Sequence, residues 1–434
     1  MEESRLYGLF VAHPTITTDS RNCPAGSIFF ALKGDKFDGN RYAQKALDAG
    51  CAYAVVDDAQ YVPEGDERYI LVGNVLQTLQ QLARIHREHF HHPVLQITGT
   101  NGKTTTKELV AAVLAEKYCV LATEANYNNH IGVPKTLLRL KPENDFAVIE
   151  TGANHPGEIK ALAEITEPDC GLITNVGRAH LAGFGSFEGV IRTKGELYDY
   201  LRKKPGGLVF IHGDNPYLNA ISEGLRLVKY GKPGHGDYFV EGEVTECLPY
   251  LSYRWRKVGE SEWHGSATHL IGAYNVDNVL AAVCVGTYFG VAPELIDRAI
   301  GGYVPKNDRS ELRRTENNTL IVDAYNANPT SMEAAIRNFM TMDGLHKMAV
   351  LGDMKELGEA SEEEHQKIVD LLGQGGVETV WLVGENFRKT KNGFRTFGMV
   401  EEVEAELRNH PIKGRLILIK GSNGTGLFRL PDFL

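Results

Sequence analysis

The chain has 434 residues, of which 42% are hydrophobic and 24% are charged, and its formal net charge is −10. This length suits two to four domains, and the composition is typical of a soluble globular protein. The negative charge argues against nucleic acid or an anionic membrane as a general partner. The longest nearly apolar stretch, 279–292, is shorter than the roughly 18 residues of a membrane span, so no membrane insertion is expected.

Cysteine usage and the N-terminus indicate a cytoplasmic location. The six cysteines lie far apart and form no C-x-x-C pair, so reduced thiols are expected rather than disulfides or a zinc site. The first residues lack a basic segment followed by an apolar one, so no secretory signal is expected.

Residues 1–90 begin with short strand-like runs, around Ser27–Leu32, and close with a helical pattern from Val75 to His89. Four histidines gather near the end of that pattern, at positions 86, 89, 91 and 92. A metal site is one interpretation. A helix end and linker is favoured, because no carboxylate or thiolate set with a known metal-ligand spacing lies nearby.

A phosphate-binding loop follows a predicted strand at 93–98 and precedes a helical pattern at 107–118. The loop residues are Gly99, Thr100, Asn101, Gly102, Lys103, Thr104 and Thr105. In such a loop, backbone N–H groups face the anion, the lysine supplies a positive charge and the threonine hydroxyl can bind Mg²⁺. Ile97 occupies the usual first-glycine position, and this shorter Gly-x-x-Gly-Lys-Thr form argues against an ordinary switch GTPase. We therefore predict nucleoside triphosphate binding.

The middle region alternates between strand-like and helical patterns, which predicts βαβ units and a mainly parallel sheet. The predicted strands are 93–98, 118–123, 145–150, 170–175 and 207–212. Residues 237–270 suggest an antiparallel excursion, and 275–292 suggest a buried helix.

Several polar side chains follow these strands and have two interpretations each. Glu150 is either a Mg²⁺ ligand beside the loop or a solvated carboxylate, and the loop favours the ligand. Asn154 and His155 are ligand contacts or cap residues, and His180 is a metal ligand or a structural histidine. The amide-rich segment 126–130 is a turn or a substrate-reading loop.

A second alternating region begins after residue 304, with predicted strands at 320–323, 348–351, 380–383 and 416–419. Asn328 and Pro329 mark a helix start. The acid and amides from Asp323 to Asn328 suit a small zwitterion. We predict an α/β protein with three domains, 1–90, 91–304 and 305–434, and a nucleotide between the last two.

These segments together resemble the Mur ligase family, the ATP-dependent amide ligases of peptidoglycan precursor synthesis, over nearly the whole chain. The stretches that carry the resemblance are 19–21, 26–34, 37–39, 98–105, 126–129, 132–134, 323–329, 351–358 and 420–424. The resemblance implies a small N-terminal uridine-nucleotide domain, a central P-loop ATPase domain and a C-terminal Rossmann-like domain. One departure is Glu124-Ala125, where relatives often have a glycine, which bears on the local loop shape.

The resemblance also assigns roles to individual residues. The implied nucleotide-binding residues are Gly99 to Thr105, Asn275, Arg309 and Asp323. The implied substrate-binding residues are Ser20, Arg21, Lys33, Gly34, Asp38, Gly39, Asn126, Asn128, Asn129, Asn154, His155, Tyr325, Asn326 and Asn328. The implied catalytic residues are Lys103, His180, Lys194 and Arg309. Two Mg²⁺ sites are implied, formed by Thr104, Glu150, His180 and a carbamylated Lys194, although the pattern around Lys194 alone is that of a surface lysine.

The motifs in 323–424 resemble most those of the members that join D-alanyl-D-alanine to UDP-N-acetylmuramoyl-tripeptide through an acyl phosphate. The Asp-Asn-Pro-Arg segment of the diaminopimelate-adding relatives is absent from the sequence. A tripeptide-forming Mur ligase and a folylpolyglutamate-type ligase are the alternatives, and the motifs at 19–39 argue against the second. A non-catalytic nucleotide-binding regulator is disfavoured by the set of metal ligands. A monomer is expected.

Overall fold

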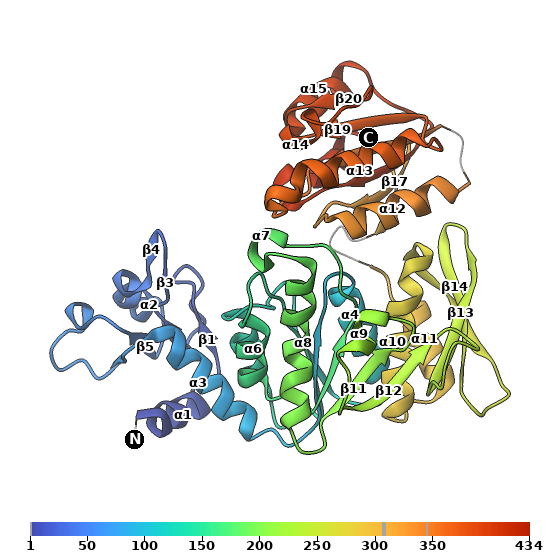
Figure 1. Ribbon diagram of the computed structural model, residues 1–434. Coiled ribbons are helices and arrows are strands. Elements are labelled where there is room, and N and C mark those ends of the chain that lie inside the picture. Colours follow the sequence, from blue (N-terminus) through green and yellow to red (C-terminus); the bar gives the residue numbers. More distant parts are fainter. Residues whose placement is uncertain (1, 306–309, 344–345) are drawn as a thin grey trace.

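The computed structural model describes residues 2–305, 310–343 and 346–434. Within these ranges the chain is a mixed α/β protein of three domains, each built around its own sheet, so the predicted fold class is confirmed (Figure 1). No helix in this part of the chain is long and apolar enough to cross a membrane.

The N-terminal domain contains a four-stranded parallel sheet with the order β1-β2-β5-β6. The strands are β1 (Ile16–Thr17), β2 (Ile28–Phe30), β5 (Tyr53–Val56) and β6 (Tyr69–Leu71), with a ribbon of β3 (Lys33–Gly34) and β4 (Phe37–Asp38). The helices are α1 (Glu2–Ala12), α2 (Ala43–Asp48) and α3 (Val75–Glu88). Helix α3 was predicted from the sequence and α1 was not, because the apolar residues of α1 show only weak helical periodicity.

The central domain contains nine strands in the order β15-β14-β13-β12-β11-β10-β7-β9-β8. The strands are β7 (Val94–Thr98), β8 (Val120–Ala122), β9 (Phe146–Glu150), β10 (Cys170–Ile173), β11 (Leu208–His212), β12 (Arg226–Gly231), β13 (Val240–Cys247), β14 (Tyr250–Lys257) and β15 (His264–Ile271). Strands β8 to β13 pair in parallel, and β13, β14 and β15 are antiparallel, which confirms the excursion predicted for 237–270.

Helices cover both faces of this parallel sheet, and they are α4 (Lys103–Ala115), α5 (Gly132–Leu137), α6 (Glu158–Thr166), α7 (Leu181–Phe184), α8 (Phe187–Lys203), α9 (Pro216–Ala220), α10 (Val276–Tyr288) and α11 (Pro293–Gly302). Helix α10 is buried, as predicted, but it is shorter than 275–292 and follows a 3₁₀ turn at Ala273–Asn275. All five residues of β7 are buried, as expected of a strand covered on both faces. The loop 99–102 therefore leaves the C-terminal end of a central strand, where α/β proteins bind ligands.

The C-terminal domain contains six strands in the order β16-β17-β21-β18-β19-β20, and only β16 is antiparallel to its neighbour. The strands are β16 (Glu311–Arg314), β17 (Thr319–Asp323), β18 (Lys347–Gly352), β19 (Thr379–Val383), β20 (Arg395–Phe397) and β21 (Leu416–Lys420). The helices are α12 (Pro329–Thr341), α13 (Ser361–Gly373), α14 (Glu385–Arg388) and α15 (Val400–Asn409). Asn328 caps α12 and Pro329 is its first residue, which confirms the predicted helix start.

The three domains are joined in two different ways. The N-terminal and central domains share one apolar core, in which residues such as Phe10 and Leu79 pack with Val94 and Leu137. The buried Arg87 of α3 donates hydrogen bonds to the carbonyl oxygen of Thr166 and to the carboxylate of Asp169 in the central domain. The C-terminal domain meets the central domain mainly through polar groups described below, with Ile271 as a buried apolar contact.

Candidate active site

A cavity of about 800 Å³ lies where the three domains meet, at the C-terminal ends of the central strands. It is lined by the loop 99–105, by polar residues of the central domain and by residues of the C-terminal domain that include Asp323, Tyr325 and Thr330. Gln80 of the N-terminal helix α3 completes one wall. The cavity therefore brings together most of the residues that the sequence analysis selected in the last two domains.

The phosphate-binding loop needs its glycines. Gly99 has φ +142°, and a Cβ at this position would overlap Oγ1 of Thr174. Gly102 has φ +75°, and a Cβ there would overlap the side chain of Asn278. Both backbone conformations are rare for residues other than glycine. The space that a Cβ would need is occupied by the side chains of Thr174 and Asn278. The glycine pattern thus reflects close packing as well as room for a ligand.

The segment after β10 holds this loop in place. The backbone N–H of Asn101 donates to Oδ1 of Asn175 at 3.0 Å, and Oγ1 of Thr174 donates to the carbonyl oxygen of Asn101 at 2.6 Å. The backbone N–H of Gly177 donates to Oγ1 of Thr100 at 3.0 Å. Side-chain partners therefore fix the backbone of the loop.

Lys103 opens helix α4 directly after the loop. Its Nζ donates to the carbonyl oxygens of Gly99 and Thr100 at 2.9 and 3.0 Å, so the ammonium lies folded over the loop that it would serve. Lys103 and the buried Thr104 both line the cavity. A cation and a hydroxyl at a helix N-terminus suit a polyphosphate with its bound cation.

Glu150 ends β9 inside the cavity with 1% of its surface exposed. Its Oε1 accepts a hydrogen bond from Nδ2 of Asn128 at 2.9 Å, whereas its buried Oε2 has no hydrogen-bond partner among the described residues. A buried carboxylate oxygen without a hydrogen-bond partner is costly unless a ligand satisfies it, so this geometry suits a cation. Asn128 thus has a defined structural role, which is to orient Glu150.

Lys194 lies in α8 with 2% of its surface exposed, although its sequence context is that of a surface lysine. Its Nζ lies 5.3 Å from the centre of the Phe184 ring, and no described residue accepts a hydrogen bond from it. Burial, and then the positive charge of Lys103, lower the pKa of Lys194 to about 7. The side chain is therefore a neutral amine for a large fraction of molecules at neutral pH.

His180 follows β10 and caps the short helix α7 with a left-handed backbone at φ 52°. Burial lowers the pKa of His180, the positive charges of Lys103 and Lys194 lower it further, and Glu356 of the C-terminal domain opposes the shift. Nδ1 of His180 lies in contact with the Glu356 carboxylate. His180, Lys194 and Glu150 all line the same cavity.

Glu150, His180 and Lys194 do not form an ordinary cluster of histidine and carboxylate metal ligands. In the described ranges, no group of three or more His, Cys, Asp or Glu side chains is arranged to hold a metal ion. The unpaired Glu150 oxygen and the hydroxyl of Thr104 are hard oxygen donors that fit Mg²⁺. Lys194 fits a metal site only after conversion to an oxygen donor.

Asn275 begins a chain of buried amides behind the loop. Its Nδ2 donates to the carbonyl oxygen of Ile271 at 2.8 Å, and its Oδ1 accepts from Nδ2 of Asn278 at 2.8 Å. Oγ1 of Thr106 in turn donates to Oδ1 of Asn278 at 3.0 Å. Asn278, which the sequence analysis missed, therefore links α10 to α4, and the spacing N-x-x-N on a helix was the available signal.

Asp323 ends β17 at the cavity and forms an ion pair with the buried ammonium of Lys420. Tyr325 and Asn326 also line the cavity, whereas Asn328 lies outside its lining and contacts Asn101 of the loop. Lys420 was missed as a single residue, because a lysine at the end of an apolar strand has no distinctive pattern. Arg309 lies outside the described residues.

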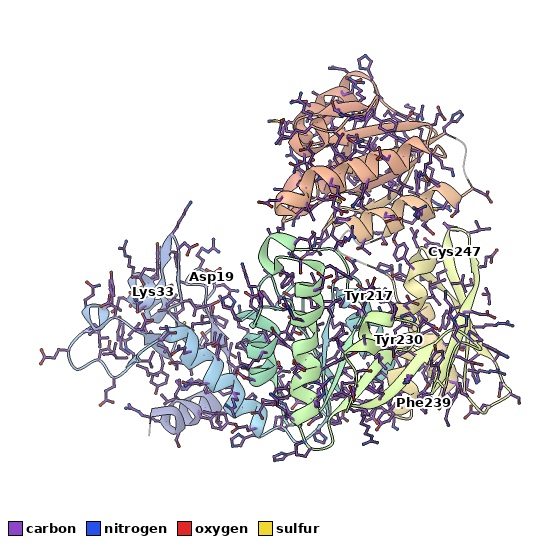
Figure 2. The ribbon with its side chains drawn as sticks, in the orientation of Figure 1. Asp19, Lys33, Tyr217, Tyr230, Phe239 and Cys247 are labelled. Carbon is purple, nitrogen blue, oxygen red and sulfur yellow. The ribbon has the colours of Figure 1, made fainter. Side chains whose placement is uncertain are left out.

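The candidate residues of the N-terminal domain do not line this cavity. Figure 2 shows Asp19 and Lys33 on the N-terminal domain, away from the contact between the other two domains. Nη2 of Arg21 donates to Asp19 at 2.8 Å, and Nζ of Lys33 lies 2.8 Å from Oδ1 of Asp57. Ser20, Gly34, Asp38 and Gly39 lie in the same domain, where Asp38 accepts from the N–H of Asn40 at 3.0 Å. A ligand that contacts both the cavity and these N-terminal residues would have to extend from one domain to the other.

Three further candidates make local bonds. Oδ1 of Asn129 accepts from the N–H of Gly132 at 2.9 Å, which is the turn interpretation of this segment. The N–H groups of Asn154 and His155 both donate to Oε2 of Glu158, which is the cap interpretation. Asn126, Asn129 and Asn154 line the cavity nonetheless, and His155 does not.

Family models match most of the chain. The model described as "Mur ligase family, catalytic domain" matches residues 14–87, "Mur ligase middle domain" matches 97–286, and "Mur ligase, glutamate ligase domain" matches 308–423. Among curated proteins, the UDP-N-acetylmuramoyl-tripeptide–D-alanyl-D-alanine ligase of Bacillus subtilis (strain 168) is 34% identical over 426 residues, which cover 95% of this chain and 91% of the relative.

Solved structures of similar proteins have the same fold. MurF from Acinetobacter baumannii superposes with a TM-score of 0.84 at 30% identity, covering 96% of this chain and 92% of the other. MurF ligase from Thermotoga maritima, solved in complex with ADP, superposes with a TM-score of 0.84 at 25% identity, covering 96% of each chain.

Proposed function

The chain belongs to the Mur ligase family, and we propose that it joins D-alanyl-D-alanine to UDP-N-acetylmuramoyl-tripeptide with the energy of ATP, in peptidoglycan precursor synthesis. The observation that carries the proposal is the single cavity that holds the phosphate-binding loop, the buried Glu150 carboxylate and polar groups of the C-terminal domain. ATP binding is supported by this loop and by the relative solved with ADP. We propose the predicted boundaries 1–90, 91–304 and 305–434 for the domains, and a monomeric enzyme.

A carboxylate does not react with an amine to form an amide in water, because its oxygen is a poor leaving group, so the substrate carboxylate must first be activated. The terminal carboxylate oxygen of the tripeptide attacks the γ-phosphorus of ATP, ADP leaves, and an acyl phosphate forms. The neutral amine of D-alanyl-D-alanine then attacks the acyl carbon. The nitrogen loses a proton to solvent, the tetrahedral intermediate loses phosphate, and the amide remains. Lys103, the N–H groups of the loop and Arg309 would balance the charge on the transferring phosphoryl group.

Mg²⁺ would supply charge neutralisation at the phosphates when bound. Thr104 and Glu150 would hold one ion, and Glu150, His180 and a carbamylated Lys194 would hold a second. Carbamylation replaces an amine of depressed pKa with an oxygen donor of negative charge, which fits a buried lysine without a hydrogen-bond acceptor.

The substrates would span the molecule. The uridine end would be bound by Ser20, Arg21, Lys33, Gly34, Asp38 and Gly39, and the peptide by Asn126, Asn128, Asn129, Asn154 and His155. Tyr325, Asn326 and Asn328 would contact the dipeptide, and Asn275 and Asp323 the nucleotide. The ion pair of Arg21 with Asp19 is solvent-exposed, so a phosphate can replace the Asp19 carboxylate at low cost. The partner of Lys33, Asp57, is 11% exposed and also accepts hydrogen bonds from Asn40 and from the N–H of Val75, so Lys33 is held more firmly.

Phosphate release from ATP and Mg²⁺ tests the proposal, with UDP-N-acetylmuramoyl-tripeptide and D-alanyl-D-alanine each present or omitted. We expect release only with both substrates, together with a pentapeptide product in the mass spectrum. Lys103→Ala should abolish turnover in a folded protein. Release with a folate acceptor or with a different amine would reject the proposed substrates, and no release with any acceptor would favour a binding protein.

A further inference from the structure

The C-terminal domain places a carboxylate against His180. Glu356 follows β18, and its carboxylate lies in contact with Nδ1 of His180 across the domain boundary. The other neighbours of the ring are the aromatic ring of Phe184, with centroids 6.1 Å apart, and the positive charges of Lys103 and Lys194. Within the described residues, Glu356 is therefore the acidic partner of this imidazole.

The backbone around Glu356 is arranged to reach His180. Glu356 has φ 65°, a left-handed conformation that is uncommon for a residue with a side chain. Its carbonyl oxygen accepts a hydrogen bond from the N–H of Ala182 at 3.2 Å, which ties it to the helix that His180 caps. A residue held in such a conformation at a functional site justifies a functional hypothesis.

Two further contacts fix the same boundary. Nη1 of Arg178 lies 3.0 Å from Oε1 of Glu364, and Oγ1 of Thr330 accepts from the N–H of Arg178 at 3.2 Å. These contacts are close to the Glu356 contact in sequence but leave His180 untouched. They supply the matched control for an experiment on Glu356.

A neutral imidazole has one N–H and one lone pair, and the partner of one nitrogen decides where the proton lies. A carboxylate at Nδ1 favours the proton there and leaves the lone pair on Nε2. Histidines that bind metals commonly donate their other ring N–H to a carboxylate, which orients the ring and strengthens metal binding.

We propose that Glu356 is a positioning residue that keeps the His180 proton on Nδ1 and so presents Nε2 to the second metal ion. This inference rests on the proposed function, because it assumes that His180 binds that ion. Since Glu356 belongs to the C-terminal domain, the second metal site is complete only when this domain contacts the central one. Contact between the two domains would thus affect metal binding through the Nδ1 proton of His180, in addition to any link that the substrates provide.

Binding of Mn²⁺ to the full-length protein tests the inference, with a non-hydrolysable ATP analogue, UDP-N-acetylmuramoyl-tripeptide and bicarbonate present. In Glu356→Gln we expect one of two Mn²⁺ ions to bind roughly 10-fold to 100-fold more weakly, with the other unchanged. Glu356→Asp should retain part of the affinity, because it keeps a carboxylate. The control Glu364→Gln should bind both ions as the wild type does.

A spectroscopic readout separates the inference from activity. Two-bond ¹H–¹⁵N correlations on histidine-labelled protein, assigned with His180→Asn, should show a protonated Nδ1 at His180 in the wild type and a changed tautomer mixture in Glu356→Gln. Unchanged Mn²⁺ affinity and tautomer in Glu356→Gln would overturn the inference. Equal losses in Glu364→Gln would overturn it too, because they would assign the effect to domain contact. A wild type without ligase activity would instead reject the proposed function.

Discussion

Nδ2 of Asn328 donates a hydrogen bond to Oδ1 of Asn101 at 2.7 Å, which links the N-terminus of α12 to the phosphate-binding loop of another domain. The same side chain accepts from the N–H of Ser331 at 2.9 Å and caps its helix. The side-chain nitrogen of Asn328 therefore links two domains, while its side-chain oxygen caps α12. Substitutions can separate these two roles.

Asn328→Ser keeps an oxygen that can cap α12 but removes the donor to Asn101, whereas Asn328→Ala removes both. We expect Asn328→Ala to cost about 1 kcal/mol of stability and Asn328→Ser much less. Both should raise the KM for ATP. Calorimetry of the C-terminal domain transition and steady-state kinetics check the pair, and equal stability losses would argue against the separation.

Gly99→Ala should abolish nucleotide binding while the fold persists. The added Cβ would overlap Oγ1 of Thr174, and φ of +142° is strained for alanine, so the loop would move. Turnover should fall as well, because a displacement of about 1 Å at such a site can cost roughly 100-fold in rate. Gly73→Ala is the control, because a Cβ there meets nothing within 4 Å. ADP titration would contradict the prediction if Gly99→Ala bound like the control.

Adjacent asparagines should behave differently. Asn128 donates to Glu150, so Asn128→Ala should weaken Mg²⁺ activation roughly 10-fold to 100-fold with little change in thermal stability. Asn129 accepts from backbone N–H groups of its own turn, so Asn129→Ala should lower stability first. Mg²⁺ dependence and thermal denaturation, measured on both variants, distinguish the two roles. The reverse pattern would reject these assignments.

Carbamylation of Lys194 should depend on pH. Between the folded-state pKa of about 7 and the ordinary value of 10.5, the folded chain leaves this amine neutral while the unfolded chain protonates it. The unfolded state binds more protons in this window, so the contribution of Lys194 to stability rises with pH there. Only the neutral amine adds CO₂, so a ¹³C carbamate signal from labelled bicarbonate should be larger at about pH 8 than at about pH 6.

Lys194→Ala provides the control for that signal. The variant should lose the resonance and most of its activity, and added short carboxylic acids should restore part of the activity by supplying an oxygen donor. Wild-type-like rates without additives would contradict the carbamate role.

Lys420→Met should destabilise the C-terminal domain. The Lys420 ammonium is 1% exposed and pairs with Asp323, so removal of one partner leaves an uncompensated carboxylate. Losses of this kind are about 3–5 kcal/mol. Thermal denaturation checks the prediction, and the double variant Lys420→Met with Asp323→Leu should regain part of the lost stability.

The fold class and the loop 99–105 could be predicted because they depend on local patterns. The features that identify the loop lie within a few residues of each other in the sequence: the buried strand β7, the short glycine spacing and the start of α4. The cap at Asn328 was predicted for the same reason. Such features follow from backbone geometry that neighbouring residues determine.

Features that depend on distant contacts could not be predicted from the residues themselves. Lys194 was interpreted as a surface lysine because of its residue type, yet it lies on the buried face of α8, four residues after Val190 and three before Leu197. The contacts of Glu356 with His180 and of Lys420 with Asp323 join positions far apart in the chain. Ala125 has φ 47°, a left-handed conformation that favours glycine, at the Glu124-Ala125 departure described in the sequence analysis.

The two domain interfaces differ in composition, and this difference affects which domains can be exchanged between related proteins. A shared core and the buried Arg87 make residues 1–90 and the central sheet one unit that cannot be cut without exposing apolar surface. The C-terminal domain meets the central domain through polar pairs, such as Asn328 with Asn101, and through contacts with the buried Ile271, which a transplanted domain would have to reproduce. Under the proposed function the C-terminal domain contacts the incoming amine, so replacing this domain would change amine recognition. A transplanted domain would also have to supply Asp323 at the cavity and Glu356 against His180.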